Sequence, residues 1–172
     1  DYNTSGLIIL GKNDIITKEL NKASMEKSIR KSYLCAVSGY FLLPTDTLTA
    51  FLLKDSTQSK VRISNIEIKN SQKIMTRYTV LKEANNMSLL DIELLTGKTH
   101  QIRAHLAHVG HPIVGDPLYG FPSVNKKANL KTQALCAYKL LFHNINEGSP
   151  LYYLNNRTFQ ISSIPFMSLF SK

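Results

Sequence analysis

The chain has 172 residues, a length that favours one domain with a core large enough to fold without disulfides or structural metals. Hydrophobic residues make up 43% and charged residues 19%, which is ordinary for a globular protein. No apolar run approaches the roughly 18–20 residues needed to span a bilayer, and no signal-peptide pattern is present. We therefore expect neither a membrane-spanning function nor a membrane partner.

The charge balance points to a polyanionic partner. Lys plus Arg total 21 against 12 acidic residues, which gives a net charge of +9. Nucleic-acid binding, in which each neutralised phosphate releases counterions, competes with the simpler interpretation of a solvated, lysine-rich surface. The excess is greatest in a stretch where only Asp55 and Glu67 are acidic. Its basic residues are Lys54, Lys60, Arg62, Lys69, Lys73, Arg77 and Lys82.

The two cysteines indicate a reducing compartment. Cys35 and Cys136 both lie in apolar stretches, and two cysteines are too few for a disulfide framework. We expect buried, reduced thiols in a cytoplasmic protein.

In chain order, the first predicted elements are a strand, a helix and a strand. A polar turn leads into the apolar run at residues 7–10, which predicts a buried strand. Residues 17–30 predict a helix that Thr17 would cap, and residues 32–38 predict a second strand.

Alternation of apolar and polar residues then predicts an antiparallel sheet. The alternation slips out of phase in the second of the four runs. The runs are residues 47–53, 60–69, 74–81 and 88–95.

The pattern changes at residues 99–109. Ile102, Leu106 and Val109 recur at helical spacing, and Thr99 could cap the helix that they predict.

The last predicted elements are a loop and a strand. Residues 121–131 predict a mobile loop, and residues 132–143 predict a final strand. Helices inserted between runs of strands indicate an α+β fold, with a mixed, mainly antiparallel sheet flanked by helices. We expect residues 1–172 to form a single domain.

A row of histidines raises the possibility of a metal site. His100, His105, His108 and His111 fall within twelve residues, but the predicted helix ends before His111. The H-E-x-x-H pattern is absent and no cysteine lies nearby, so the spacing does not predict a metal centre. Histidines that face RNA, or that bond within the protein, are the favoured interpretation.

The segment from residue 94 to residue 103 is the first candidate for chemistry. A strand ends, Gly97 turns the chain and a helix begins, so free backbone N–H groups at the helix start could bind phosphate. Arg103 lies one turn into this helix and could reach a cleft beside the sheet. A surface arginine on a capped helix is the competing interpretation. The polar residues at the helix start are Lys98, Thr99, His100 and Gln101.

Asp1 is the second candidate, on a loop before the first predicted strand. A carboxylate there could be a general base, a nucleophile or a metal ligand, or it could only close a turn. Taken alone, the turn is favoured.

Taken together, these segments resemble the RluA-type RNA pseudouridine synthases. The resemblance rests on five motifs in the order that the family has them, and they cover most of the chain. The motifs are residues 1–7 (DYNTSGL), 31–39 (KSYLCAVSG), 96–106 (TGKTHQIRAHL), 111–120 (HPIVGDPLYG) and 133–140 (QALCAYKL).

The resemblance implies a role for each candidate residue. Asp1 would be the catalytic aspartate, attacking either the uracil ring or the ribose. Tyr33 would stack on the flipped base and take part in proton transfer at C5. Arg103 would pair with Asp1 and keep its carboxylate ionised. Leu94 or Leu95 would form an apolar wall beside the base, and the polar residues at the helix start would contact RNA.

Three departures from the family pattern stand out. Lys98 replaces the usual arginine, and Cys136 replaces a common histidine. The family's catalytic domain also begins well before Asp1, so we expect that an N-terminal part is missing and that this chain alone is poorly active.

The resemblance implies an RNA pseudouridine synthase that needs no cofactor and acts on RNA as a monomer. Ribosomal RNA is the expected substrate and transfer RNA the alternative. A non-catalytic, basic RNA-binding module is the competing hypothesis, and a metal hydrolase built on the histidines is a remote third.

Overall fold

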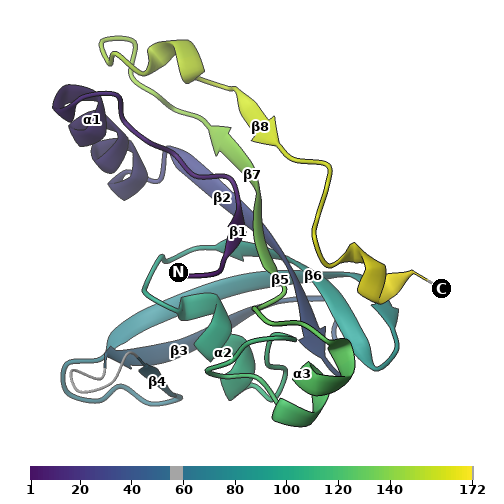
Figure 1. Cartoon of the computed structure of the whole chain (residues 1–172). Helices are drawn as coiled ribbons and strands as arrows, with labels where there is room; N and C mark the ends of the chain where they lie inside the picture. The colour runs from purple at the N-terminus through teal and green to yellow at the C-terminus, as the bar shows by residue number, and fades with distance from the viewer. Residues whose placement is uncertain (55–59, 172) are drawn as a thin grey trace.

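A computed structural model describes residues 1–54 and 60–171 of the chain. Its strands form one mixed sheet, and its three α-helices lie at the sheet's faces and end (Figure 1). The strands are β1 (Ser5–Gly6), β2 (Ile29–Ser38), β3 (Thr45–Lys54), β4 (Val61–Ser64), β5 (Gln72–Ala84), β6 (Met87–Leu94), β7 (Leu135–Phe142) and β8 (Thr158–Gln160). The helices are α1 (Asp14–Met25), α2 (Gln101–His108) and α3 (Pro122–Ala128), with short 3-10 turns at Tyr152–Leu154 and Met167–Phe170.

The sheet runs in the order β1-β7-β2-β6-β5-β3-β4, and β8 also pairs with β7. Among the described strands β1 pairs with β7 in parallel, and the other pairings are antiparallel. The predicted α+β class with a mixed, mainly antiparallel sheet is therefore confirmed. Within the described residues, no helix combines the length and the apolar character required to cross a bilayer.

Two long strands give the molecule its shape. One end of β2 and of β7 rises out of the body of the sheet and carries α1 and β8, and we call this part the arm (Figure 1). A β-bulge at Tyr138 interrupts the pairing of β2 with β7 next to Tyr33. Bulges bend and twist a strand pair, and this one separates the end of the pair that packs with α1 from the end that packs in the body.

The core is divided between the body and the arm. In the body, Leu90 and Ile92 of β6 and Leu106 of α2 are fully buried, together with the segment that follows α2. In the arm, a smaller cluster forms where α1 packs on the ends of the two long strands. Its buried members are Ala23, Ile29, Leu140, Phe142, Ile145 and Leu151. Both predicted thiols, Cys35 and Cys136, are buried and unpaired, as expected.

The predicted buried strand at residues 7–10 is wrong. Leu7 donates its backbone N–H to the Ala137 carbonyl oxygen at 2.8 Å, and pairing then stops, because β8 occupies this edge of β7 from Lys139 onward. Ile8 is 79% exposed, whereas Leu7 packs against the arm's cluster.

The first helix begins earlier and ends earlier than predicted. Its N-cap is Asn13, whose Oδ1 accepts a hydrogen bond from the Ile16 N–H at 2.9 Å, so Thr17 is not the cap. The helix ends at Met25, because the chain turns through Lys27, at φ 60°, into β2.

Two further segments differ from prediction. The slip in alternation within residues 60–69 marks a strand that ends at Ser64, after which Ile66 is 71% exposed. Residues 121–131 contain helix α3, with Pro122 in its first turn, rather than a plain loop. Asp55, one of the two acids in the basic stretch, lies outside the described residues.

Helix α2 is shorter than the predicted 99–109 helix. It begins at Gln101, and its N-cap is His100 in the left-handed conformation, so Thr99 does not cap it. Ile102 is buried as predicted, but Val109 follows the last helical residue and is 37% exposed. Helix α2 packs against β3, β4 and β5, which brings its first turn to the N-terminal segment of the chain.

Candidate active site

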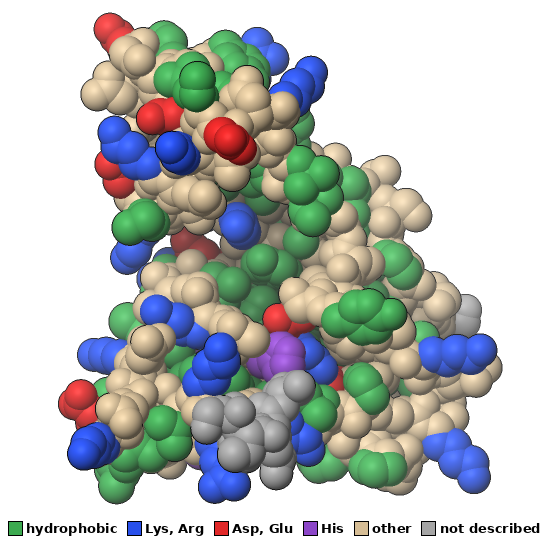
Figure 2. All heavy atoms as spheres, turned by 60° about the vertical axis from the view of Figure 1, so that its left-hand side comes forward, with side chains coloured by type: hydrophobic (Ala, Val, Ile, Leu, Met, Phe, Trp, Pro, Cys, Tyr) green, Lys and Arg blue, Asp and Glu red, His purple; other side chains and the backbone are tan. Residues whose placement is uncertain are grey.

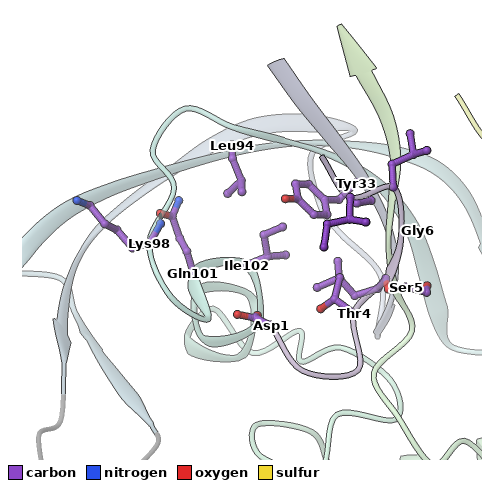
Figure 3. Close-up of a pocket in the computed structure, with 13 residues that line it drawn as sticks. Asp1, Thr4, Ser5, Gly6, Tyr33, Leu94, Lys98, Gln101 and Ile102 are labelled. Carbon is purple, nitrogen blue, oxygen red and sulfur yellow. Dashed lines mark hydrogen bonds between the residues drawn. The ribbon is translucent and has the colours of Figure 1, made fainter. Parts of the chain in front are cut away.

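A cavity of about 270 Å³ opens where the N-terminal turn, β2, the end of β6 and the start of α2 meet. In Figure 3 Asp1 lies at one side of it, with Tyr33 and Leu94 across from the carboxylate. The space-filling view shows a hollow between the arm and the body with apolar side chains inside it (Figure 2). The lining residues are Asp1, Thr4, Ser5, Gly6, Leu7, Ile8, Tyr33, Leu94, Lys98, Gln101, Ile102, Leu135 and Ala137.

Two hydrogen bonds hold the N-terminal turn in place, one within the turn and one from the segment just before β7. The Thr4 N–H donates to the Asp1 carbonyl oxygen at 3.2 Å and closes the turn. Gln133, just before β7, donates its Nε2 to the Tyr2 carbonyl oxygen at 2.8 Å. The Asp1 side chain is 20% exposed, so its carboxylate faces the cavity while staying partly shielded from water.

Two residues of the α2 segment approach the Asp1 carboxylate. Nη1 of Arg103 is 3.8 Å from Oδ2, an ion-pair distance that is longer than a hydrogen bond. The backbone N–H of His100 donates to Oδ1 at 3.4 Å. The predicted neighbours Asp1 and Arg103 are therefore brought together, with His100 beside them.

Asp116, however, is the main partner of Arg103. Nε and Nη2 of Arg103 donate to the two carboxylate oxygens of Asp116 at 2.7 and 2.9 Å. The Arg103 side chain is only 5% exposed, and that of Asp116 is fully buried. This two-point pairing fixes the guanidinium plane, so that only its Nη1 edge is turned toward Asp1.

Asp116 is held as a charged group. Burial alone would raise the pKa of its carboxyl, but the bonds from Arg103 and from the backbone N–H groups of Leu118 and Tyr119 bring that pKa below its ordinary value. The positive charge of Arg103 is thus already balanced before Asp1 is considered. Arg103 consequently orients Asp1 more than it neutralises it.

The ring of Tyr119 completes this cluster. The Arg103 guanidinium carbon lies 5.3 Å from the Tyr119 ring centroid, within cation–π range. The Tyr119 hydroxyl accepts a hydrogen bond from the Val61 N–H at 2.9 Å and lies 3.1 Å from Nδ1 of His100. Burial first, and the charge of Arg103 second, lower the pKa of His100.

Tyr33 and Leu94 form the apolar part of the cavity. Tyr33 is half-buried on β2, and burial raises its pKa, which keeps the phenol protonated at neutral pH. Leu94 ends β6 on the same side of the sheet. Leu95 is half-buried but does not line the cavity, so Leu94 is the better placed of the two predicted wall residues.

The polar residues at the start of α2 have different surroundings. Lys98 is exposed and lines the cavity mouth, whereas Thr99 is exposed and outside it. Gln101 is 2% exposed, and its amide donates to the Met75 carbonyl and to Thr76 Oγ1, both at 3.1 Å. Gln101 thus braces the turn before α2, and its contact with RNA stays a prediction.

The four clustered histidines face four different partners. His105 bonds to Thr76, His108 to Asn65 and His111 to the Ser38 carbonyl, while His100 meets Tyr119. Across the described residues, no group of three or more His, Cys, Asp or Glu side chains is placed to hold a metal ion.

Comparison with known proteins fits this geometry. The sequence pattern of the RNA pseudouridylate synthase family matches residues 1–108, which include Asp1, Tyr33 and Arg103. The chain belongs to this family.

Two bacterial proteins show the similarity of this RNA pseudouridylate synthase family member to its relatives. The chain is 33% identical over 164 residues to ribosomal large subunit pseudouridine synthase C of Buchnera aphidicola, covering 90% of this chain and 52% of that protein. It is 32% identical over 155 residues to the protein of the same name from Haemophilus ducreyi, covering 88% of this chain and 48% of that protein. The chain therefore spans about half the length of these relatives. The resemblance to the RluA type is confirmed.

Solved structures agree on the fold. Human RNA pseudouridylate synthase domain containing 1 superimposes with a TM-score of 0.69 at 22% identity, covering 88% of this chain and 61% of that one. Human RNA pseudouridylate synthase domain containing 4 gives a TM-score of 0.61 at 18% identity, over 76% and 59% of the two chains.

The sequence did not point to Asp116 and Tyr119, the two residues that surround Arg103 in the site. Both lie in the quoted segment 111–120, but no role was assigned to them. The available signal was Asp116 itself, a carboxylate between Gly115 and Pro117 in an otherwise apolar run. Such a carboxylate is expected to be buried, and a buried carboxylate needs a cationic partner.

Proposed function

We propose that this chain carries the catalytic centre of an RNA pseudouridine synthase, which isomerises uridine to pseudouridine. The observation that supports this most is the placing of Asp1, Tyr33 and Leu94 around one cavity, in a chain of the RNA pseudouridylate synthase family. Arg103 lies behind Asp1 at ion-pair distance.

The isomerisation conserves every atom. The bond from uracil N1 to ribose C1′ breaks, the base turns, and a bond from C5 to C1′ forms while C5 loses a proton and N1 gains one. Asp1 would serve as the attacking carboxylate, on the uracil ring or on the ribose. Tyr33 would stack on the extruded base and take part in the proton transfer at C5, and Leu94 would complete an apolar slot.

The substrate proposed for this chain is RNA, with large-subunit ribosomal RNA first and transfer RNA second. The relatives' names support the first choice, and the net charge of +9 supports a polyanion. Lys98, which lines the cavity and is exposed, would meet a phosphate next to the extruded nucleotide. We further propose that the protein acts as a monomer in the cytoplasm. We propose no cofactor, since the reaction involves no change of oxidation state.

The test is tritium release from RNA labelled at uridine C5. The wild-type chain, in excess over a large-subunit ribosomal RNA transcript so that slow turnover is still visible, should release label in a single turnover. The Asp1→Asn variant should bind the same RNA and release none, because an amide cannot act as the nucleophile.

Two results would contradict this proposal. Label release by Asp1→Asn at the wild-type rate would remove Asp1 from the chemistry. Tight binding by the wild-type chain without release, over times long enough for many turnovers of a slow enzyme, would favour the competing non-catalytic RNA-binding module.

A further inference from the structure

His100 occupies an unusual position beside the candidate nucleophile. Its backbone is left-handed, with φ 56° and ψ 14°, and it is the N-cap of α2, although its side chain makes no capping bond. Such a conformation is costly for a residue with a Cβ and persists where surrounding contacts impose it. Here the imidazole is turned between Asp1 and Tyr119, and only 16% of it is exposed.

The contact between the Tyr119 hydroxyl and Nδ1 of His100 bears on which ring nitrogen carries the proton. That hydroxyl already accepts the Val61 N–H at 2.9 Å, so the best use of its single proton is to donate to Nδ1 of His100 at 3.1 Å. An Nδ1 that accepts a hydrogen bond carries no proton, and a neutral ring must then carry its proton on Nε2. The lowered pKa of His100, caused first by burial, agrees with a neutral ring.

The other ring nitrogen of His100, Nε2, faces Asp1. Nε2 of His100 is 4.0 Å from Asp1 Oδ1, which is longer than a hydrogen bond, and the His100 backbone N–H reaches the same oxygen at 3.4 Å. The other oxygen, Oδ2, is 3.8 Å from Nη1 of Arg103. Each oxygen of the carboxylate is therefore approached by a different side chain.

One turn, residues 116–119, controls both of these side chains. Asp116 accepts from two donors on one edge of the Arg103 guanidinium, which leaves Nη1 for Asp1, while Tyr119 contacts the His100 ring. The turn is itself fixed by Asn125 of α3, whose Oδ1 accepts the Gly115 N–H at 2.7 Å and whose Nδ2 donates to the Asp116 carbonyl at 2.9 Å.

We propose that the 116–119 turn is the positioning element of the site, and that His100 is a positioning residue which presents an Nε2–H to the Asp1 carboxylate in a tautomer set by Tyr119. A neutral donor aims the carboxylate without adding a second cation that would weaken it as a nucleophile. The catalytic meaning of this arrangement rests on the proposed function, but the tautomer of His100 does not.

Nitrogen NMR of the 172-residue chain tests the tautomer directly. Long-range proton–nitrogen spectra of chain labelled with ¹⁵N-histidine distinguish a protonated ring nitrogen from a bare one, and loss of one signal set in His100→Gln assigns the ring. We expect a bare Nδ1 and a protonated Nε2 at neutral pH. A protonated Nδ1 in the wild-type chain would overturn the proposal.

A pair of tyrosine variants then tests the cause. Tyr119→Phe should turn the single His100 tautomer into a mixture. Tyr138→Phe is the matched control, since it also removes a tyrosine hydroxyl that bonds to a side chain, Asp91, and it should leave the His100 signals unchanged. A His100 spectrum unaffected by Tyr119→Phe would show that Tyr119 does not set the tautomer.

Kinetics separate positioning from simple structural support. Tyr119→Phe should lower kcat for tritium release by roughly tenfold with KM close to wild type, because the RNA contacts are kept while the aim of Asp1 changes. Its unfolding midpoint should fall, because the Val61 N–H loses its acceptor, and Tyr138→Phe, which also loses a hydrogen bond, controls for that loss. Equal losses in kcat for Tyr119→Phe and Tyr138→Phe would contradict the positioning role. If the tautomer is as expected but the wild-type chain releases no label, the proposed function fails while the assignment of the His100 ring stands.

Discussion

His105 is a buried neutral base in the middle of helix α2. It is 1% exposed, and its Nδ1 lies 3.0 Å from the hydroxyl oxygen of Thr76. Burial first, and the nearby His108 second, lower the pKa of His105 to about 4. In the unfolded chain the same side chain titrates near its ordinary value of about 6.5.

This difference makes stability depend on pH in a defined window. Above about pH 6.5 neither state binds the proton, so the full stability is present; as the pH falls toward 4 only the unfolded state binds it, and stability is lost. We expect a loss of about 3 kcal/mol from His105 between pH 7 and pH 4, calculated from its pKa of about 4 in the folded chain.

Urea unfolding at pH 7 and pH 4 measures this loss. His105→Gln keeps a polar partner for Thr76 but cannot titrate, so its unfolding free energy should fall by about 3 kcal/mol less than that of the wild-type chain. His108→Gln, an exposed position on the same helix, is the control and should fall nearly as much as wild type. Equal losses in the wild type and His105→Gln would disprove a buried neutral His105.

At the same scale, the sequence identified the residues of recognisable motifs better than the residues that hold them in place. Asp1, Tyr33 and Arg103 were predicted from their motif positions; Asp1 and Tyr33 line the cavity, Arg103 lies behind Asp1 at ion-pair distance, and their catalytic roles stay predictions. Asp116 and Tyr119 were missed because their importance lies in a contact with Arg103 that only the folded chain creates.

The elements differ in how far local sequence determines them. Strand β6 was predicted to within one residue at each end. Strand β5 extends two residues before and three residues beyond its predicted range, because its regularly buried positions, Ile74, Thr76 and Tyr78, lie only in its first half. The run at residues 7–10 has strand-like composition but finds the β7 edge already occupied by β8. Competition for an edge is a property of the whole sheet, and no local pattern records it.

The turn between α2 and β7 depends on a glycine that has no room for a side chain. Gly115 has φ +79°, and an added Cβ would lie 2.3 Å from the Thr132 carbonyl oxygen. Gly110 has a similar φ of +90°, but an added Cβ there would meet nothing within 4 Å. Alanine at either position would therefore have a conformational cost of roughly 1–2 kcal/mol, because of the positive φ. Only at Gly115 would its Cβ also collide with backbone.

We therefore expect Gly115→Ala to lower the unfolding free energy by at least about 2 kcal/mol more than Gly110→Ala, since backbone must move to relieve the contact. Because the displaced turn carries Asp116, label release should fall as well. Denaturant unfolding of both variants measures the difference. Similar losses in the two variants would show that the contact with Thr132 is relieved at little cost.

On the scale of the whole molecule, the arm and the body enclose the cavity between them, and the charge is arranged around this opening. Figure 2 shows Lys and Arg side chains on both sides of the hollow. All seven basic residues of the stretch from Lys54 to Lys82 are exposed, and Lys98 lies at the cavity mouth. Composition alone left a polyanionic partner and a solvated, lysine-rich surface as alternatives, and the alternation did not reveal the β-bulge at Tyr138 in the strand pair that carries the arm.

This arrangement predicts an RNA affinity that is strongly dependent on salt and sensitive to charge at the cavity mouth. Each phosphate neutralised by a side chain contributes about 0.7–0.9 to the slope of log affinity against log salt concentration. Lys98→Gln should weaken binding and reduce that slope by about 1, because one phosphate contact is lost. Lys22→Gln, on helix α1 and outside the lining of this cavity, changes the net charge equally and should leave the slope nearly unchanged.

Fluorescence anisotropy titrations of a labelled ribosomal RNA fragment, from about 50 to about 200 mM salt, measure both slopes. Equal reductions for the two variants would mean that net charge, and not the position of Lys98, governs RNA binding.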